Sequence, residues 1–374
     1  MTNPRVHIVT FDVPWPDNYG GVIDVFHKIR HLHALGYEIH LHSFTYGRPE
    51  ATILNRYCSA VYYYQRKVSK LLLLQSTPYI VAGRVNDQLV KRVLADDAPV
   101  LLEGLHCTAQ FADMGLQRRT IIMRAHNIEH DYYHHLSKTE SHPFKKLYLE
   151  QEAVKLQKYE SSVLHHLPVA AISVADFNYF RKRYGHAIHI PAFHRNDSVN
   201  IQEGRGEYFF YHGNLGVSEN LAAVNWLLQE VLPHLQHKLV IAGQKIPARL
   251  IQQYASKGVE FHVSPSSEEM GKLIRNAQVI LLPAVQETGI KLKLIESLYN
   301  GRHLLVNTAM ANEPVLKSMC HLCDDPRQFA ETANHLFVET FTDSDIRKRE
   351  ELLLENYSNR TSASNLRKAL QASW

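Results

Sequence analysis

At 374 residues, the chain is longer than one hydrophobic core usually serves, which indicates two domains. Hydrophobic residues make up 45% of the sequence and charged residues 21%, a composition typical of a globular protein. The net charge of +4, from 41 basic and 37 acidic residues, is too balanced to indicate a nucleic-acid-binding protein. It is compatible with an anionic substrate or with a membrane surface as partner.

The sequence contains no segment that predicts secretion or insertion into a membrane. The N-terminal segment lacks a basic region followed by an apolar one, and no apolar run approaches the ~18 residues of a membrane helix. Of the four cysteines, only Cys320 and Cys323 form a C-x-x-C pair, and neither zinc ligation nor a disulfide framework is favoured. We therefore expect a cytoplasmic protein with no zinc site at this pair.

The first 44 residues predict a strand, a helix and a second strand. Residues 5–11 form the first strand, a loop rich in Pro and Gly ends at Gly20 and Gly21, a helix covers 22–34, and the second strand covers 37–44. Such a unit implies parallel pairing in a doubly wound sheet that binds ligands at the carboxyl ends of its strands. The two glycines therefore lie where the backbone can approach a ligand closely.

Further apolar segments extend this first sheet. They cover residues 60–64, 99–104, 120–126, 168–173 and 186–190, and an amphipathic helix is predicted from about 144 to 166. His126 stands at the carboxyl end of its strand. A histidine there can bind a sugar hydroxyl or adjust the charge near a reacting centre.

Two other patterns are interpreted as structural. His40 and His42 share one face of their strand, but no third metal ligand is evident beside them. Asp343 and Asp345 form a D-x-D sequence directly before a helical stretch, where aspartate caps backbone N–H groups.

Residues 66–74 combine basic side chains with a run of leucines. An interfacial segment that rests on anionic lipid has this composition, and so does a core helix with a basic start. The sequence leaves both interpretations open.

The second half repeats the organisation of the first. A polar linker covers about 191–207, and a glycine-containing loop, 213–220, follows the first strand of the new set. The predicted strands cover residues 208–212, 238–243, 259–263, 279–282 and 303–307. They alternate with helices, which indicates a second Rossmann-like sheet, and the chain ends in helical segments from about 344 to 370.

The last of these loops has the pattern of an anion site. Gly289 permits a tight turn after a buried strand, and a helix is predicted over 290–299 with Lys291 and Lys293 in its first turn. Free N–H groups and the positive end of the helix dipole favour an anion there. Glu296 would repel a phosphate, but it suits a neutral polyol such as a ribose.

In this order, five segments resemble the family 4 retaining glycosyltransferases of the GT-B fold. They are residues 18–21, 124–129, 211–214, 239–243 and 288–296. The resemblance implies an α/β protein with two facing Rossmann-like doubly wound parallel sheets and a cleft between them. It assigns acceptor binding to residues 1–193, donor binding to residues 207–357, and a helix at about 358–374 that packs back on the first domain.

The resemblance also implies roles for individual residues. Glu296 would bind the donor ribose, Gly20 and Gly21 would supply backbone near the diphosphate and acceptor, and His126 would contact the transferred sugar. Thr288 stands where the family motif has its first glutamate. Whether Thr288 or its neighbour Glu287 contacts the sugar is open, as part of a donor site that also includes Gly213 and Gly289.

The chain departs from the family at two positions of the donor loop. Asn214 and Asn220 stand where the family often has Arg and Lys. A diphosphate without a cation would be poorly compensated, because an exposed helix end contributes only ~0.3–1 kcal/mol. We therefore expect Lys291, with Lys293 as second candidate, to replace the missing pair.

The function that the resemblance implies is transfer of a hexose-type sugar, with retention of configuration and without a metal or other cofactor. The donor would be a UDP- or GDP-linked sugar, and the acceptor a glycan or a lipid-linked glycan. Peripheral contact with the inner face of a membrane through residues 66–74 fits such an acceptor. The alternatives are an enzyme similar to a sugar-nucleotide epimerase and a degenerate subunit that only binds nucleotide-sugar.

Overall fold

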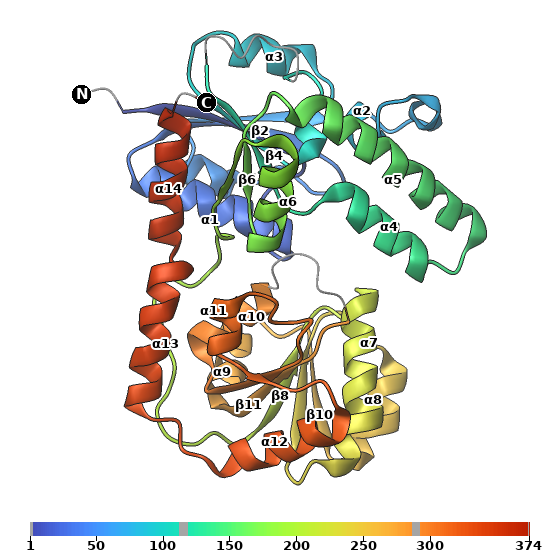
Figure 1. Cartoon of the computed structure of the whole chain (residues 1–374), viewed down its shortest axis with the longest axis vertical. Helices are drawn as coiled ribbons and strands as arrows, with labels where there is room; N and C mark the ends of the chain where they lie inside the picture. Colours follow the sequence, from blue (N-terminus) through green and yellow to red (C-terminus); the bar gives the residue numbers. More distant parts are fainter. Residues whose placement is uncertain (1–2, 112–118, 286–291, 373) are drawn as a thin grey trace. The chain divides into compact units, whose positions relative to one another are not determined.

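The computed structural model describes residues 3–111, 119–285, 292–372 and 374 (Figure 1). They divide into two compact units. The first contains the described residues up to His194 and those from Asn359 onward, and the second contains those from Arg195 to Ser358. Each unit is built on one parallel sheet, which confirms the predicted fold class of two Rossmann-like sheets.

The sheet of the first unit has the strand order β3-β2-β1-β4-β5-β6-β7, with every neighbouring pair parallel. The strands are β1 (Arg5–Thr10), β2 (Glu38–Thr45), β3 (Ala60–Gln65), β4 (Val100–Glu103), β5 (Ile121–Ala125), β6 (Val169–Ala171) and β7 (Ala187–His189). The order reverses between β1 and β4. Doubly wound sheets bind ligands at such a reversal, outside the carboxyl ends of the strands.

Helices cover both faces of this sheet, because successive residues of each strand point to opposite sides. Ile8 belongs to the core under α1 (Gly20–Ala34) and α14 (Asn359–Gln371), which contact each other. Val9 belongs to the core on the other face, with α3 (Asp87–Val93), α5 (Pro143–Leu164) and α6 (Val174–Tyr184). The short α2 (Tyr79–Ala82) and the helix α4 (Glu129–Thr139), which pairs with α5, complete this unit.

The helix α1 begins at Gly20, two residues before the predicted start. An added Cβ on Gly21 would lie 2.8 Å from the Cζ atom of Phe11, so a side chain at position 21 would displace that ring. The ring of Phe11 lies edge-on to that of His126, with centroids 5.5 Å apart. Gly21 is thus needed for close packing next to a predicted site residue.

Helix α14 is joined to the first unit by a buried asparagine at its start. The side chain of Asn359 accepts from the backbone N–H of His194 at 3.0 Å and donates to the carbonyl of the same residue at 2.8 Å. Leu366 and Leu370 then bury their side chains against the sheet core. Helix α14, from the end of the chain, thereby covers one face of the first sheet together with α1.

The sheet of the second unit has the order β10-β9-β8-β11-β12-β13 and is also parallel. Its strands are β8 (Tyr208–His212), β9 (Leu239–Gly243), β10 (Val259–Val263), β11 (Ala277–Leu282), β12 (His303–Val306) and β13 (His321–Leu322). Its helices are α7 (Ser218–Trp226), α8 (Ala248–Tyr254), α9 (Ser267–Asn276), α10 (Leu292–Asn300), α11 (Pro314–Ser318), α12 (Pro326–Val338) and α13 (Asp343–Asn356). The order reverses between β8 and β11, so both sheets repeat one topology.

The D-x-D sequence is part of a helix cap, as the sequence predicts. Thr342 is the N-cap of α13, and its hydroxyl accepts from the backbone N–H of Asp345 while the Asp345 carboxylate accepts from the N–H of Thr342. These reciprocal bonds form a capping box. The aspartates therefore have a structural role.

Candidate active site

The predicted site residues follow the strands that flank the reversal in each sheet. In the first unit, Gly20 and Gly21 follow β1, and His126 follows β5 directly. In the second unit, Gly213 and Asn214 follow β8, whereas Lys293 and Glu296 lie on α10 beyond β11. Both groups therefore lie at the carboxyl edge of their own sheet, where the fold binds ligands.

A buried ammonium group organises the carboxyl edge of the first sheet. The Nζ atom of Lys28 lies 2.8 Å from Asp24 Oδ2 and 2.6 Å from Glu103 Oε1, and all three side chains are buried. Asp24 and Lys28 are four residues apart on α1, so they share one face of the helix. Glu103 ends β4, which places the three charges between helix and sheet.

A second buried cation completes this cluster. Arg124 on β5 donates to both oxygens of Asp24, at 3.2 Å from Nε and 2.9 Å from Nη2. Its remaining donors reach the backbone carbonyls of Ile190 and Pro191. Buried charges are tolerated only when they are paired and hydrogen-bonded, and here each carboxylate has a cation beside it.

The pKa values of both carboxyls follow from these neighbours. Burial by itself would raise the pKa of Asp24, but the charges of Arg124 and Lys28 more than offset it and hold the pKa below its usual range. Burial likewise opposes ionisation of Glu103, while Lys28 and His126 lower its pKa. Both groups are ionised at neutral pH.

His126 is oriented by this cluster. Its Nε2 atom lies 3.0 Å from Glu103 Oε2, and because an ionised carboxylate can only accept, Nε2 carries the proton. The other nitrogen, Nδ1, is left to face other groups. Glu103 thus determines which nitrogen of His126 can contact another group.

Ligand atoms of Asp24, Glu103 and His126 all lie within 4.8 Å of one another, a spacing that a metal ion could use. In this structure the cation at that position is the ammonium of Lys28. The charge that a metal would supply to the two carboxylates is therefore supplied by the chain itself.

A buried glutamate lies at the start of α4, next to this cluster. Burial, reinforced by the charge of Glu160, raises the pKa of Glu129 to about 8. The Nδ1 atom of His106 lies 4.0 Å from its carboxylate, and the ring of His106 lies 5.3 Å from that of Phe11. Such shifts are common at functional sites, and Glu129 adds an uncharged acid to this edge at neutral pH.

In the second unit, Lys293 reaches Asn220, which in turn bonds to Asn214. Its Nζ atom donates to Asn220 Oδ1 at 2.8 Å, and Asn220 in turn donates from Nδ2 to the backbone carbonyl of Asn214 at 3.0 Å. The ammonium also lies 3.4 Å from the hydroxyl of Tyr211. A cation from α10 is therefore placed beside the loop after β8.

The remaining described residues of this donor region are on or next to α10. Glu296 is half-buried and lies three residues after Lys293, on the same side of the helix. Ser297 bonds to the buried His212 at 2.8 Å, and burial, with the charge of Lys293, lowers the pKa of that imidazole to about 3. His212 is thus neutral and links the end of β8 to α10.

Four of the predicted residues, Glu287, Thr288, Gly289 and Lys291, lie outside the described residues. Their predicted roles stay predictions. Of the two lysines proposed to replace the missing pair, the structure describes the second, Lys293.

Sequence reasoning missed Asp24, Lys28, Glu103 and Glu129. A signal was present for the first three. Asp24 and Lys28 lie four residues apart on the face of α1 that also carries apolar residues. Glu103 is the last residue of an otherwise apolar strand. Charges within otherwise apolar patterns indicate pairing or function. Glu129 lacked such a signal, since its helix was not predicted.

The sequence is similar to known proteins. Residues 206–338 match the family described as Glycosyl transferases group 1. An uncharacterized 44.6 kDa protein in the cps region of Klebsiella pneumoniae is 25% identical over 331 residues, which cover 83% of this chain and 84% of that protein. The matched family segment lies in the second unit.

Solved structures share the fold over nearly the whole chain. Sucrose-phosphate synthase from Thermosynechococcus elongatus has a TM-score of 0.71 at 13% identity and covers 98% of each chain. The protein TarM has a TM-score of 0.67 at 10% identity and covers 99% of each chain. An E. coli structure described as trehalose-6-phosphate bound with UDP-2-fluoro glucose has a TM-score of 0.61 at 12% identity and covers 99% of each chain.

At these identities the solved structures establish the fold, and the family match covers a segment of the second unit. The assignment to family 4 in particular stays a prediction. The matched segment thus resembles the group 1 glycosyltransferases, and the two sheets give the chain the GT-B fold.

Proposed function

We propose that the protein transfers a hexose-type sugar from a UDP- or GDP-linked donor to a glycan or lipid-linked acceptor, with retention of configuration. Donor binding is assigned to the second unit and acceptor binding to the first. The observation that carries the proposal is the position of Lys293, whose ammonium lies 2.8 Å from Asn220 Oδ1.

The diphosphate of the donor needs positive charge at the carboxyl edge of the second sheet. Helix α7 begins beside the loop after β8, and its N-cap residue Val217 has no side-chain oxygen with which to cap it. Its dipole favours an anion, but at an exposed site contributes only ~0.3–1 kcal/mol. Lys293 adds a full charge at the same place, which supports its assignment as the diphosphate-binding cation.

The position of Lys293 weakens the alternative of a degenerate subunit that only binds nucleotide-sugar. That alternative rests on the absence of Arg and Lys at positions 214 and 220. Lys293 brings a cation to this loop from another element, so the loss of the two family side chains does not leave the loop without charge. Glu296, on the same side of α10, is assigned to the ribose hydroxyls.

In the first unit, His126 is assigned to the transferred sugar or to the attacking hydroxyl. Glu103 holds a proton on Nε2, so Nδ1 is the nitrogen that can face a ligand. Glu103 and Asp24 are each paired with a buried cation. Because these pairs occupy their oxygens, neither carboxylate is a suitable nucleophile. This favours front-face attack, in which the leaving diphosphate receives the proton of the acceptor hydroxyl and the protein supplies positioning and charge.

We further propose that the protein contacts anionic membrane through residues 66–74. The segment η2 (Lys70–Leu74) is exposed apart from the half-buried Leu72, so it is not the core helix that the sequence had left open. Leu71 and Leu74 are 73% and 84% exposed, next to the exposed Lys67 and Lys70. Apolar side chains flanked by cations suit the surface of an anionic bilayer.

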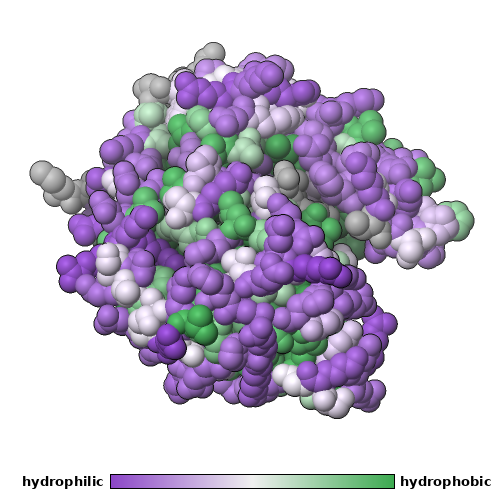
Figure 2. Space-filling model, turned by 60° about the horizontal axis from the view of Figure 1, so that its bottom comes forward, coloured by the Kyte–Doolittle hydropathy of each residue, from purple (hydrophilic) through white to green (hydrophobic). Residues whose placement is uncertain are grey.

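This contact would be peripheral. Among the helices that the structure describes, none has the length and apolar character needed to cross a bilayer. On the face drawn in Figure 2, hydrophobic residues occur as small groups among hydrophilic ones. The exposed leucines of η2 therefore form a local anchor.

Replacing Lys293 tests donor binding. We expect Lys293→Ala to weaken binding of UDP or GDP at least about tenfold, ~1.4 kcal/mol, because the diphosphate loses its cation. Isothermal titration measures the affinity. Lys272→Ala is the matched control, since Lys272 pairs with Glu268 on the exposed face of α9.

A second substitution sharpens the same test. Asn220→Lys, introduced into the Lys293→Ala variant, should recover part of the lost affinity because it returns a cation to the same place. An unchanged nucleotide affinity in Lys293→Ala would contradict the assignment.

Replacing Glu103 tests the orientation of His126. Glu103→Gln should lower kcat by roughly tenfold to a hundredfold, with little change in KM, because an uncharged amide that can also donate no longer fixes the proton on Nε2. The double variant Glu103→Gln/His126→Ala should be about as slow as His126→Ala, since the two residues act as a unit. Circular dichroism controls for folding, and a wild-type kcat in Glu103→Gln would refute the role.

The stereochemistry of the product tests the mechanism. Front-face attack leaves the configuration of the anomeric carbon as it is in the donor, and NMR of the product reads it directly. An inverted anomer would contradict the mechanism while leaving glycosyl transfer itself intact.

Membrane contact is tested with vesicles that contain anionic lipid. We expect the wild type to sediment with them, less so at high salt, and the double variant Leu71→Glu/Leu74→Glu to bind at least about tenfold more weakly, because two exposed apolar side chains are lost. Leu354→Glu, on the exposed part of α13, is the control. Equal binding of the double variant and the wild type would exclude this surface.

A further inference from the structure

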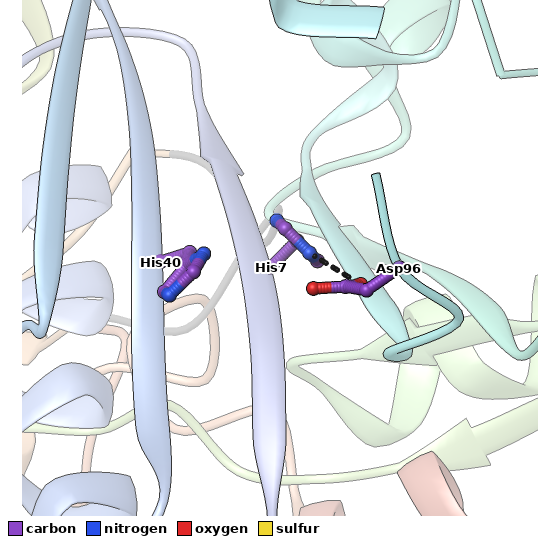
Figure 3. Close-up of side chains that lie close together, drawn as sticks. All are labelled: His7, His40 and Asp96. Carbon is purple, nitrogen blue, oxygen red and sulfur yellow. Dashed lines mark hydrogen bonds and ion pairs between the residues drawn. The ribbon is translucent and has the colours of Figure 1, made fainter. Parts of the chain in front are cut away.

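A second polar cluster lies toward the amino end of the first sheet, away from the edge that carries His126. His7 on β1 and His40 on β2 are partners in register, so their side chains share one face of the sheet. Asp96, in the segment between α3 and β4, approaches His7 from the neighbouring side (Figure 3). The tertiary structure thereby supplies the third ligand that the sequence did not show beside His40.

The spacing of these groups suits a transition-metal ion. The Nε2 atom of His7 lies 3.0 Å from Asp96 Oδ1, and one ligand atom from each of His7, His40 and Asp96 lies within 4.8 Å of the others. Two ligands that each lie about 2.1 Å from a tetrahedral ion are about 3.4 Å apart. The distance between His7 and Asp96 is slightly shorter than this, so the two groups would move apart around an ion while His40 moved toward them.

A shell of hydrogen bonds behind His7 fixes its ring. Its Nδ1 atom lies 3.0 Å from Nε2 of His42, whose Nδ1 lies 2.9 Å from the hydroxyl of Tyr64, and Arg92 donates to that hydroxyl at 3.0 Å. Histidines that bind metals are usually oriented in this way through their second nitrogen. A metal ion on Nε2 of His7 would take the place of the proton that Asp96 accepts there, and Nδ1 would then donate to His42.

The charges around the cluster accept a cation. Asp96 and Glu38 carry two negative charges, and Arg5, which pairs with both, carries one positive charge. Arg119 bonds to the backbone carbonyl of Asp96 and pairs with the exposed carboxylate of Asp97. The Arg5 side chain is 38% exposed, and exposed ion pairs are weak and easily rearranged. In contrast to Asp24 and Glu103, these carboxylates have no buried ammonium between them.

A metal ion could reach this cluster from solvent. His40 and Asp96 are partly exposed whereas His7 is buried, so an ion can reach the two outer ligands from solvent. The carboxylate of Glu38 lies 3.3 Å from Nε2 of His40 and could become a fourth ligand by giving up its exposed pair with Arg5. Two imidazoles with carboxylates are a ligand set that Zn²⁺ accepts.

We propose that His7, His40 and Asp96 form a binding site for a divalent transition-metal ion of the Zn²⁺ type, with Glu38 or water as fourth ligand. The ion would join β1, β2 and the segment before β4. It lies outside the groups assigned to glycosyl transfer, so its role is to stabilise the first sheet.

The test measures metal uptake by the full-length protein after removal of metal with a chelator. We expect about one Zn²⁺ per chain, tetrahedral absorption bands with Co²⁺ as a probe, and a higher Tm when Zn²⁺ is added. His40→Ala and Asp96→Asn should each lower the affinity for Zn²⁺ at least tenfold and reduce the shift in Tm. These two partly exposed residues are chosen because substitution of the buried His7 also disturbs the core.

A matched control comes from the second sheet. Glu260 and His262 repeat the Glu-x-His arrangement of Glu38 and His40 on a strand, with 2.6 Å between carboxylate and ring. His262→Ala should keep wild-type uptake and Tm shift. Absence of Zn²⁺ uptake by the wild type, or equal loss in His262→Ala and His40→Ala, would overturn the proposal, and neither result would affect the proposed transfer.

Discussion

The first unit depends on the buried ammonium of Lys28, which lies between two carboxylates that the fold has removed from water. Removing one partner of such a cluster leaves an uncompensated charge and typically costs 3–5 kcal/mol. The contacts of Lys28 and Arg124 therefore hold α1, β4 and β5 in one arrangement. Because Glu103 also fixes the proton on His126, the interaction that stabilises this edge of the sheet is the one that orients the predicted site histidine.

The second unit also has a lysine at the carboxyl edge of its sheet, on a different element. After the first strand of this sheet the chain has Asn214 and Asn220, and the ammonium of Lys293 on α10 reaches Asn220, which is why we propose Lys293 as the cation of the donor site. A diphosphate needs positive charge close to its oxygens. Both the loop after β8 and the helix after β11 lie at the reversal of strand order, so either can supply that charge. Both units thus present polar groups at the reversal of strand order.

Much of the fold could be predicted from the sequence, because hydrophobic alternation and glycine turns are local signals. The strands that flank both reversals were found in this way, and with them the places of His126, Asn214 and Glu296. Helix α4 was missed, since its polar composition lacks an apolar period. The apolar run of η2 was left undecided, because burial of a short leucine run depends on what packs against it.

The sequence by itself determined the two parallel sheets, the loops at their carboxyl edges and the resemblance that assigns them to sugar transfer. Only the tertiary structure decided which charges meet. Lys28 and Glu103 are 75 residues apart, Lys293 and Asn220 are 73 apart, and His7 and Asp96 are 89 apart. Such pairs follow from strand order and register, which bring distant segments together and leave no periodic trace in the chain.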